Sequence, residues 1–269
     1  MQVVQAARVH LAAVTHRREV APGIVALDLL APELAALTRP GQYVMAVPPL
    51  DDAAAVAFGI HDARADGIAL LFFVTGTRTR ALATLAPGDA LAMFGPLGNG
   101  FALESWRDVA IVAGGVGIAS VLLAAIALRR RDARVRLFYG ARTAQRLVER
   151  EPFVRAGCEV VVATEDGSEG VRGFVTDAMR ASEVPQQILA CGPTAMLRAV
   201  AAIAREWNVP AQLALEETFG CGVGGCWGCV VPIAQSSRQA PPVPSTHDGI
   251  VYARVCREGP VFYAADLRW

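Results

Sequence analysis

The chain has 269 residues, of which 54% are hydrophobic and 19% charged, and its 25 basic and 25 acidic side chains give a formal net charge of zero. This length suits two or three compact units, and the apolar content exceeds the roughly 45 to 50% of average soluble proteins, which excludes a disordered chain. A balanced charge, without basic stretches that alternate with aromatic residues, argues against a nucleic-acid-binding protein.

The first twenty residues include His10, His16, Arg17, Arg18 and Glu19 and contain no long apolar core. This start is unlike a secretory signal, so we expect a cytoplasmic protein. In that reducing compartment, the six cysteines are expected to be ligands, reactive thiols or small core residues rather than disulfides.

Residues 1–103 contain short β-like runs separated by turn signals. The runs include Ile24–Leu30, Gln42–Val47 and Ile68–Val74, and the turns include Pro40-Gly41, Asp66-Gly67 and Pro87-Gly88-Asp89. Short strands at this spacing predict an antiparallel β-barrel over residues 1–103.

Residues 104–212 have a different sequence pattern, in which apolar runs alternate with helix-length stretches such as Ser120–Arg131. The runs are Val109–Val112, Val135–Tyr139, Val160–Ala163 and Ile188–Ala190. Strands that alternate with helices predict an α/β unit with a parallel, doubly wound sheet.

One stretch of this unit, Val109–Leu128, has no charged residue over 20 positions, which is the length of a membrane span. Gly114, Gly115 and Gly117 lie early in it, after a β-branched run and before Ala/Leu-rich sequence. That order favours strand, glycine turn and buried helix, so no membrane span is expected.

Residues 213–269 form a short third unit, interrupted by Gln235–Gly249, a Ser/Pro/Gln-rich segment that we interpret as a flexible loop. Fewer than about 60 residues make a marginal hydrophobic core. A bound metal cluster explains how such a small unit stays folded.

Four cysteines of this unit have the spacing of a plant-type 2Fe-2S site. Cys221, Cys226 and Cys229 follow a C-x4-C-x2-C pattern, and Cys256 comes later. The many glycines among them let the backbone approach a cluster closely. The alternatives are a structural zinc site, for which two C-x2-C pairs are expected, or four buried cysteines without a ligand. Cys158, which stands apart, is interpreted as a small core residue.

Two turns at the ends of predicted strands are candidates for dinucleotide binding. Gly114, Gly115 and Gly117 lie between a strand and a helix, where a helix N-terminus favours a diphosphate. Cys191-Gly192-Pro193 follows the strand Ile188–Ala190, at the same carboxyl edge. Asp166, after Val160–Ala163, is either a ribose or adenine contact or part of a solvated turn.

With these segments in place, the sequence resembles the electron-transfer subunits of dihydroorotate dehydrogenase, a branch of the ferredoxin reductase superfamily. The resemblance spans nearly the whole chain. Its motifs are Pro40-Gly41-Gln42-Tyr43-Val44, Pro87-Gly88-Asp89, Gly95-Pro96-Leu97-Gly98-Asn99-Gly100-Phe101, Ala113-Gly114-Gly115-Val116-Gly117, Asp166-Gly167-Ser168, Gly173-Phe174-Val175-Thr176-Asp177, Cys191-Gly192-Pro193-Thr194-Ala195-Met196-Leu197 and the cysteine set.

The resemblance implies FAD in the barrel, NAD in the α/β unit and a 2Fe-2S cluster at the C-terminal cysteines. It also implies docking on an FMN-containing catalytic subunit, as a heterotetramer of two plus two chains, in pyrimidine biosynthesis. The chain would be an oxidoreductase subunit that is not itself catalytic on the organic substrate. Gly114, Gly115 and Gly117 would contact the dinucleotide phosphates, and Cys191 would lie near the nicotinamide.

The sequence departs from the family pattern at the flavin site. The family has Arg-Pro-x-Ser where this chain has Val56-Ala57-Phe58-Gly59, which lacks both the arginine for the FAD phosphate and the serine hydroxyl. The loop of Gly76, Thr77, Arg78, Thr79 and Arg80 still offers groups for a diphosphate, with Arg78 the better candidate by position.

A second departure is the long loop between Cys229 and Cys256, which leaves the identity of the partner open. The same module serving another redox partner, such as a sulfite reductase or a hydrogenase, is one alternative. A carrier or interaction subunit that has lost FAD is another. Arg142 and Thr143 after the strand at Tyr139 leave the choice between NAD and NADP open.

Overall fold

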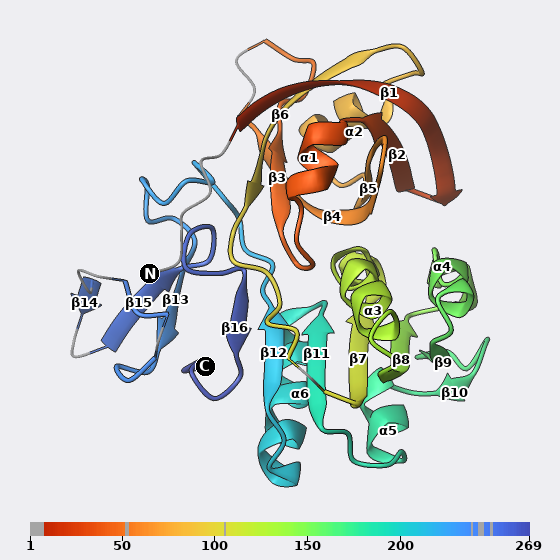
Figure 1. Ribbon diagram of the computed structural model, residues 1–269, viewed down its shortest axis with the longest axis vertical. Coiled ribbons are helices and arrows are strands. Elements are labelled where there is room, and N and C mark those ends of the chain that lie inside the picture. The colour runs from red at the N-terminus through yellow and green to blue at the C-terminus, as the bar shows by residue number, and fades with distance from the viewer. Residues whose placement is uncertain (1–7, 52–53, 105, 238, 242–244, 248–249) are drawn as a thin grey trace.

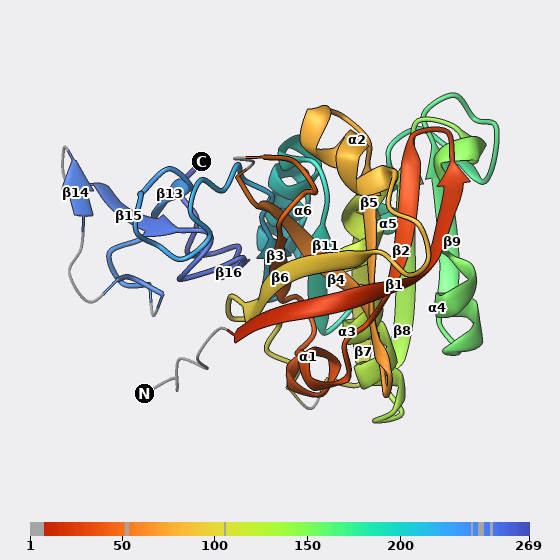
Figure 2. The ribbon, with the colours of Figure 1, turned by 90° about the horizontal axis from the view of Figure 1, so that it is seen from above.

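The computed structural model describes residues 8–51, 54–104, 106–237, 239–241, 245–247 and 250–269. It has three parts: a closed barrel, a seven-stranded sheet with helices on both faces, and a three-stranded sheet beside them (Figure 1). Viewed from above, the three-stranded sheet lies to one side of the other two parts (Figure 2).

The antiparallel β-barrel that the sequence predicts is confirmed, and its six strands have the order β1-β2-β5-β4-β3-β6. Its interior is filled by aliphatic residues such as Leu27, Ile60 and Leu70. The elements are β1 (Arg8–Ala21), β2 (Ile24–Leu30), α1 (Pro32–Leu37), β3 (Tyr43–Ala46), β4 (Val56–Arg64), β5 (Gly67–Phe73), α2 (Thr77–Ala83) and β6 (Ala90–Leu97).

The large sheet has the order β10-β9-β8-β7-β11-β12-β16, in which only β16 runs antiparallel. Its strands are β7 (Asp108–Gly114), β8 (Arg134–Ala141), β9 (Glu159–Thr164), β10 (Val171–Arg172), β11 (Gln187–Cys191), β12 (Ala211–Ala214) and β16 (Val261–Tyr263). The parallel sheet that the sequence predicts is confirmed.

Helices cover both faces of this sheet, so the central strands are apolar on both sides. Val109 and Ile111 of β7 pack with η1 and α3, whereas Ala110 and Val112 pack with α5 and α6. The elements are η1 (Gly115–Ser120), α3 (Leu122–Arg129), η2 (Ala144–Arg146), α4 (Glu151–Arg155), α5 (Val175–Arg180) and α6 (Thr194–Trp207).

The apolar stretch Val109–Leu128 is a strand, a 3-10 turn and a short helix. The predicted helix Ser120–Arg131 is two residues shorter at each end, because the glycine turn continues as 3-10 helix to Ser120. Among the described residues, no helix has both the length and the apolar character needed to cross a membrane.

The last part contains β13 (Val230–Ile233), β14 (Ser245–His247) and β15 (Ile250–Arg254), in the order β13-β15-β14. The interpretation of Gln235–Gly249 as entirely loop is wrong at Ser245–His247, whose backbone pairs with β15. Residues 238, 242–244 and 248–249 of that segment lie outside the described residues.

The second and third predicted units share one sheet. The predicted boundary after residue 212 falls within β12, and β16 from the third unit pairs with β12. Asn99, at the exit of the barrel, also receives a hydrogen bond from Val261 N at 3.1 Å and donates one to Val261 O at 2.7 Å. The boundaries 1–103, 104–212 and 213–269 remain predictions, and the three units are joined by direct contacts.

Candidate functional site

The two predicted dinucleotide turns meet at the carboxyl edge of β7 and β11. A Cβ on Gly117 would lie 2.4 Å from the carbonyl oxygen of Cys191, and a Cβ on Gly192 would lie 2.9 Å from Gly114 N. Only glycine permits such an approach between the two backbones. Gly115 has a φ of 54°, and Pro193 is the N-cap of α6. The turns thus form one continuous backbone surface at the end of the sheet.

Asp166 lies at the same edge, beyond the end of β9, and β8 separates β9 from β7. Its Oδ1 accepts hydrogen bonds from the Ser168 backbone N–H at 3.0 Å and from the Ser168 hydroxyl at 2.6 Å. These bonds lower the pKa of the exposed Asp166 carboxyl. Asp166 therefore shares the edge of the sheet with the glycine turns, while its own hydrogen bonds are made with Ser168.

The predicted flavin loop begins α2. Thr79 Oγ1 accepts the backbone N–H groups of Thr75 and Gly76 at 2.9 and 3.0 Å and lines the pocket described below. Arg78 is exposed and donates to the Ala54 carbonyl at 3.4 Å, while Thr77 accepts from Arg80 at 3.4 Å. Of the predicted residues Gly76, Thr77, Arg78 and Thr79, only Thr79 lines that pocket.

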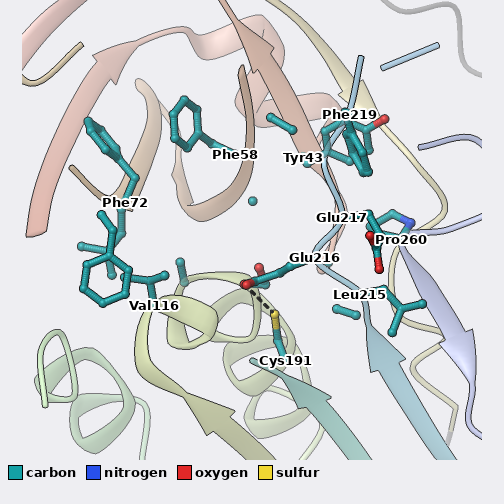
Figure 3. Close-up of a pocket in the computed structure, with 18 of the residues that line it drawn as sticks. Tyr43, Phe58, Phe72, Val116, Cys191, Leu215, Glu216, Glu217, Phe219 and Pro260 are labelled. Carbon is teal, nitrogen blue, oxygen red and sulfur yellow. Dashed lines mark hydrogen bonds between the residues drawn. The ribbon is translucent and has the colours of Figure 1, made fainter. Parts of the chain in front are cut away.

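A cavity of about 280 Å³ lies where the barrel, the large sheet and the segment after β12 meet (Figure 3). Aromatic residues contribute to its walls: Tyr43, Phe58, Phe72 and Phe73 from the barrel and Phe219 from the segment after β12. This volume is near the lower limit of ligand pockets, about 300 Å³. An apolar pocket with a few polar groups is suited to a planar aromatic ring.

Cys191 and Glu216 form the polar end of this pocket. The Cys191 thiol points at Glu216 Oε1, 3.6 Å away (Figure 3). Burial, reinforced by the Glu216 charge, raises the pKa of the Cys191 thiol well above its ordinary value, although the Ser120 hydroxyl opposes the shift. Desolvation also raises the pKa of Glu216, which lines the pocket. The thiol therefore stays protonated and donates to the carboxyl oxygen.

The altered barrel motif also lines this pocket, through Ala57, Phe58 and Gly59 of β4. Phe58 stacks at a tilt against Phe72, with ring centroids 4.9 Å apart. A Cβ on Gly59 would lie 2.5 Å from the hydroxyl oxygen of Ser120, so this oxygen occupies the space that a side chain at position 59 would take. Val56, where the family pattern has arginine, offers no charged group.

The cluster cysteines lie in a loop between β12 and β13 and in the turn after β15. Cys229 and Cys256 are buried, Cys221 is half-buried and Cys226 is exposed. Backbone N–H groups of Gly225 and Cys226 point at Cys221 Sγ, at 3.2 and 3.4 Å, and Cys256 N points at Cys229 Sγ at 3.4 Å. N–H groups aimed at sulfur stabilise thiolates, which are the ligands of iron–sulfur clusters.

Glycines keep the ligand sulfurs accessible. A Cβ on Gly220 would lie only 3.1 Å from Cys226 Sγ, and one on Gly228 would lie 3.5 Å from the same atom. Backbone hydrogen bonds, that of Val223 foremost, lower the pKa of the Cys221 thiol to about 6. Burial, together with the adjacent Cys229, raises the pKa of Cys256 to about 12. Thiols that receive backbone N–H donors in this way fit the ligands of a metal cluster.

No three His, Cys, Asp or Glu side chains in the described part of the chain converge closely enough to hold a single metal ion.

Tyr43 connects the pocket to the cluster loop. Its ring lines the pocket and meets Phe219 edge-on, with centroids 5.0 Å apart. Its hydroxyl oxygen lies 2.9 Å from Gly222 O and 2.7 Å from Cys256 O, so one hydroxyl proton is shared between two carbonyls of the ligand loops. Burial raises the pKa of Tyr43, which keeps this donor protonated.

Arg254 supports the same loop from the other side. It donates to the Gly224 carbonyl at 2.8 Å, pairs with Glu258 and lies 4.4 Å from the centre of the Trp227 ring. The side chains of Arg254 and Glu258 are only 12% and 10% exposed, which makes this a largely buried ion pair. The loop between Cys221 and Cys229 is therefore held by side chains that lie outside the cysteine pattern.

Sequence reasoning missed Glu216, Ser120 and the bridging role of Tyr43. Glu216 carries a usable signal, because it lies two residues after the end of β12 and so at the ligand-binding edge of the sheet. Ser120 and Tyr43 act through contacts between units, which local sequence patterns do not encode.

The combination of a six-stranded barrel, a parallel nucleotide-binding sheet and a cysteine loop defines a ferredoxin-reductase-like electron-transfer protein. A solved structure described as an NADH-dependent reduced ferredoxin-NADP oxidoreductase, studied for flavin-based electron bifurcation, matches with a TM-score of 0.84. It is 27% identical, and the match covers 97% of this chain and 90% of that one. A ferredoxin reductase of a carbazole 1,9a-dioxygenase matches with a TM-score of 0.67 at 21% identity, over 77% of this chain and 68% of that one, which shows the fold.

Two family models match the chain: an oxidoreductase NAD-binding domain at residues 111–202, and an iron-sulfur cluster binding domain of dihydroorotate dehydrogenase B at residues 216–268. The dihydroorotate dehydrogenase B (NAD(+)) electron transfer subunit of Desulforamulus reducens is 35% identical over 258 residues, 93% of this chain and 94% of that protein. The probable counterpart of Methanopyrus kandleri is 35% identical over 241 residues, 88% and 84% of the two chains.

The chain therefore belongs to the family of electron-transfer subunits of dihydroorotate dehydrogenase B (NAD(+)). It is an oxidoreductase subunit whose cofactors are NAD, FAD and a 2Fe-2S cluster, and it exchanges electrons with a catalytic partner subunit. The family resemblance and the cofactors expected from the sequence are thereby confirmed.

Proposed function

We propose that the pocket shared by the three parts holds the isoalloxazine ring of FAD, with NAD entering over the glycine turns and the 2Fe-2S cluster on the far side. Cys221, Cys226, Cys229 and Cys256 are the proposed cluster ligands. The observation that carries the proposal is Tyr43, which lines the pocket and contacts the backbone of both ligand loops.

The bound cofactors supply the chemistry: a flavin exchanges a hydride with NAD and single electrons with an iron–sulfur cluster, while the protein supplies position and electrostatics. Gly114, Gly115 and Gly117 leave room for the dinucleotide phosphates, together with Gly192 and Pro193 at the neighbouring strand. Cys191, held by Glu216, faces the place where a nicotinamide meets the pocket. The phenylalanine rings that line the pocket exclude water from the ring of the flavin.

The pyrophosphate of FAD lies, in this proposal, beside the α2 loop of Gly76, Thr77, Arg78 and Thr79. Arg78 is exposed and makes a single long hydrogen bond to Ala54, so its guanidinium is available to turn to an anion. Replacing Arg78 with alanine is expected to weaken FAD binding by about tenfold, because the variant loses one charge-assisted hydrogen bond to the diphosphate. Arg80→Ala is the matched control on the same helix. Equal FAD content of both variants after gel filtration would remove this role from Arg78.

The overall proposal is tested by an absorption spectrum of anaerobically purified protein, with iron, sulfide and released-flavin assays on the same sample. About two irons, two sulfides and one FAD per chain are expected. A diaphorase assay, in which NADH reduces a dye, should then be positive. Cluster without FAD would instead favour a carrier that works without flavin.

The partner that we infer is an FMN-containing catalytic subunit that oxidises dihydroorotate, in a cytoplasmic heterotetramer of two plus two chains in pyrimidine biosynthesis. The names and near-complete coverage of the relatives support it. Co-expression of both subunits followed by light scattering should give the mass of four chains. The electron-transfer chain alone should not turn over dihydroorotate.

The ferredoxin-NADP oxidoreductase, which covers 97% of this chain, favours a second candidate, in which the same module serves another redox partner. The long connection between Cys229 and Cys256 supports this candidate, because it departs from the family pattern between two proposed cluster ligands. Failure to bind the catalytic subunit, with all cofactors present, would favour it.

A further inference from the structure

The wall between the barrel and the large sheet contains a hydroxyl in an unusual position. Gly59 of β4 and Ser120, the last residue of η1, both line the pocket. A Cβ on Gly59 would lie 2.5 Å from Ser120 Oγ but 3.5 Å from Ser120 Cβ. The first distance is a clash, and the second is an ordinary contact. The absence of a side chain at Gly59 therefore gives the Ser120 hydroxyl its place.

Ser120 belongs to a short chain of polar groups at this end of the pocket. Its hydroxyl interacts with the Cys191 thiol, and that thiol donates to Glu216. The three side chains come from η1, from β11 and from the segment after β12. Many other side chains in the walls are aromatic or aliphatic. A planar ring with a polar edge would meet its hydrogen-bonding groups here.

The hydroxyl of Ser120 is better suited to a ligand than that of Thr79. Thr79 Oγ1 already accepts from Thr75 and Gly76 N–H groups and donates to the Gly76 carbonyl at 3.1 Å. Ser120 is half-buried, and a serine hydroxyl can both donate and accept as it rotates. It also sits on η1, the segment that packs against β4 and β5 of the barrel.

We propose that Ser120 is a positioning residue that hydrogen-bonds the polar edge of the flavin ring, and that Gly59 is required because it leaves room for this hydroxyl. Ser120, a residue of the nucleotide-binding part, thus contacts the flavin beside β4 of the barrel, at the position where Gly59 has no side chain. This inference rests on the proposed function, since it places the flavin ring in this pocket.

A double-mutant cycle on the full chain tests the inference. Ser120→Ala removes the hydroxyl, and Gly59→Ala forces it to rotate away, so each single variant should weaken FAD binding by about three- to tenfold, as for one hydrogen bond. Both should also shift the flavin absorption bands and the flavin midpoint potential in the same direction. In the double variant the new methyl group meets Ser120 Cβ and Cα at ordinary contact distances, so its effect should equal that of one single variant.

A swap and a control complete the test. Gly59→Ser combined with Ser120→Ala returns a hydroxyl from the barrel side and should restore FAD binding and the midpoint potential toward the original values. Ser182→Ala, which removes a hydroxyl bonded to Met179 O far from the pocket, should change neither. Iron content and circular dichroism of each variant show that folding and the cluster are intact.

Additive effects of the two alanine substitutions, or an unchanged flavin spectrum and affinity in Ser120→Ala, would overturn the role of Ser120 while leaving the flavin site in place. Absence of FAD from the unaltered chain after reconstitution would overturn the proposed function itself, and this inference with it.

Discussion

The nucleotide-binding edge and the cluster-binding loop are two sites built in different ways. The edge is formed by backbone turns that are locked between buried strands, where Gly117 and Cys191 touch through main-chain atoms. The loop from Cys221 to Cys229 contains no helix or strand and is held by N–H···S bonds, by Tyr43 and by Arg254. The first site thus follows from the fold, whereas the second is held by hydrogen bonds that reach an irregular loop from other elements.

The largest effect that separates the two sites is expected from Cys226→Ser. Iron and sulfide should fall from about two per chain to nearly none, because one ligand of the proposed cluster is lost. FAD content should stay unchanged, since the pocket walls remain. Cys158→Ser, which alters a cysteine outside the cluster, should keep both cofactors. Loss of FAD together with the cluster in a folded chain would contradict the separation of the sites.

At the nucleotide edge, Gly117→Ala should cost about 4 kcal/mol of unfolding free energy. Its new methyl group would meet the backbone of Cys191, which cannot move without distorting β11. Urea unfolding followed by circular dichroism measures this. Gly76→Ala is the control, because nothing lies within 4 Å of its Cβ position, and it should change stability by less than about 0.5 kcal/mol. Equal stability of the two variants would show that the edge tolerates rearrangement.

In the cluster loop, Arg254→Gln should destabilise by about 2 to 3 kcal/mol, because Glu258 keeps a largely buried charge without its partner. Faster hydrogen exchange should be confined to the loop near Gly224, whose carbonyl loses its donor. The exposed pair of Arg155 and Glu151 supplies the control, and Arg155→Gln should have almost no effect. Exchange that increases throughout the large sheet would argue that the loop is not an independent region.

The smallest effect concerns the contact between the barrel and the large sheet, where Glu149 receives a hydrogen bond from Arg18 at 3.0 Å and lies 3.6 Å from His61. The hydrogen bond with His61, opposed by desolvation, lowers the pKa of Glu149 to about 2 from its ordinary 4.5. A lowered pKa stabilises the fold above pH 4.5, and this contribution is lost as the pH falls toward 2.

Glu149→Gln should accordingly cost about 1 to 2 kcal/mol at pH 7 after allowance for solvent screening, and the difference from the unaltered chain should shrink below pH 4.5. Urea unfolding at pH 7 and pH 3 gives both values. Glu151→Gln serves as the control, since its partner Arg155 is exposed. A difference that grows on acidification would reverse the assigned sign.

Much of the fold follows from the sequence because its signals are local. Ile24–Leu30, a short β-like run in the sequence, is a strand over the same residues, and Gly115–Gly117 begins the 3-10 turn after a strand. The spacing of the cysteines in the sequence also predicts the proposed cluster ligands. The rest arises from contacts between distant segments, such as Ser120 beside Gly59 or Tyr43 beside Cys256. Neither side chain has a neighbour in sequence that signals such a contact.

The pairing of β16 with β12 has a consequence for how the chain folds during its synthesis. β12 precedes the whole cluster-binding segment, and β16 follows it. Until residues 261–263 emerge from the ribosome, β12 has an open edge with unpaired N–H and C=O groups, which is a template for aggregation. A nucleotide-binding fragment that stops at residue 214 should therefore precipitate more readily than the full chain, even though every strand of its parallel sheet is present.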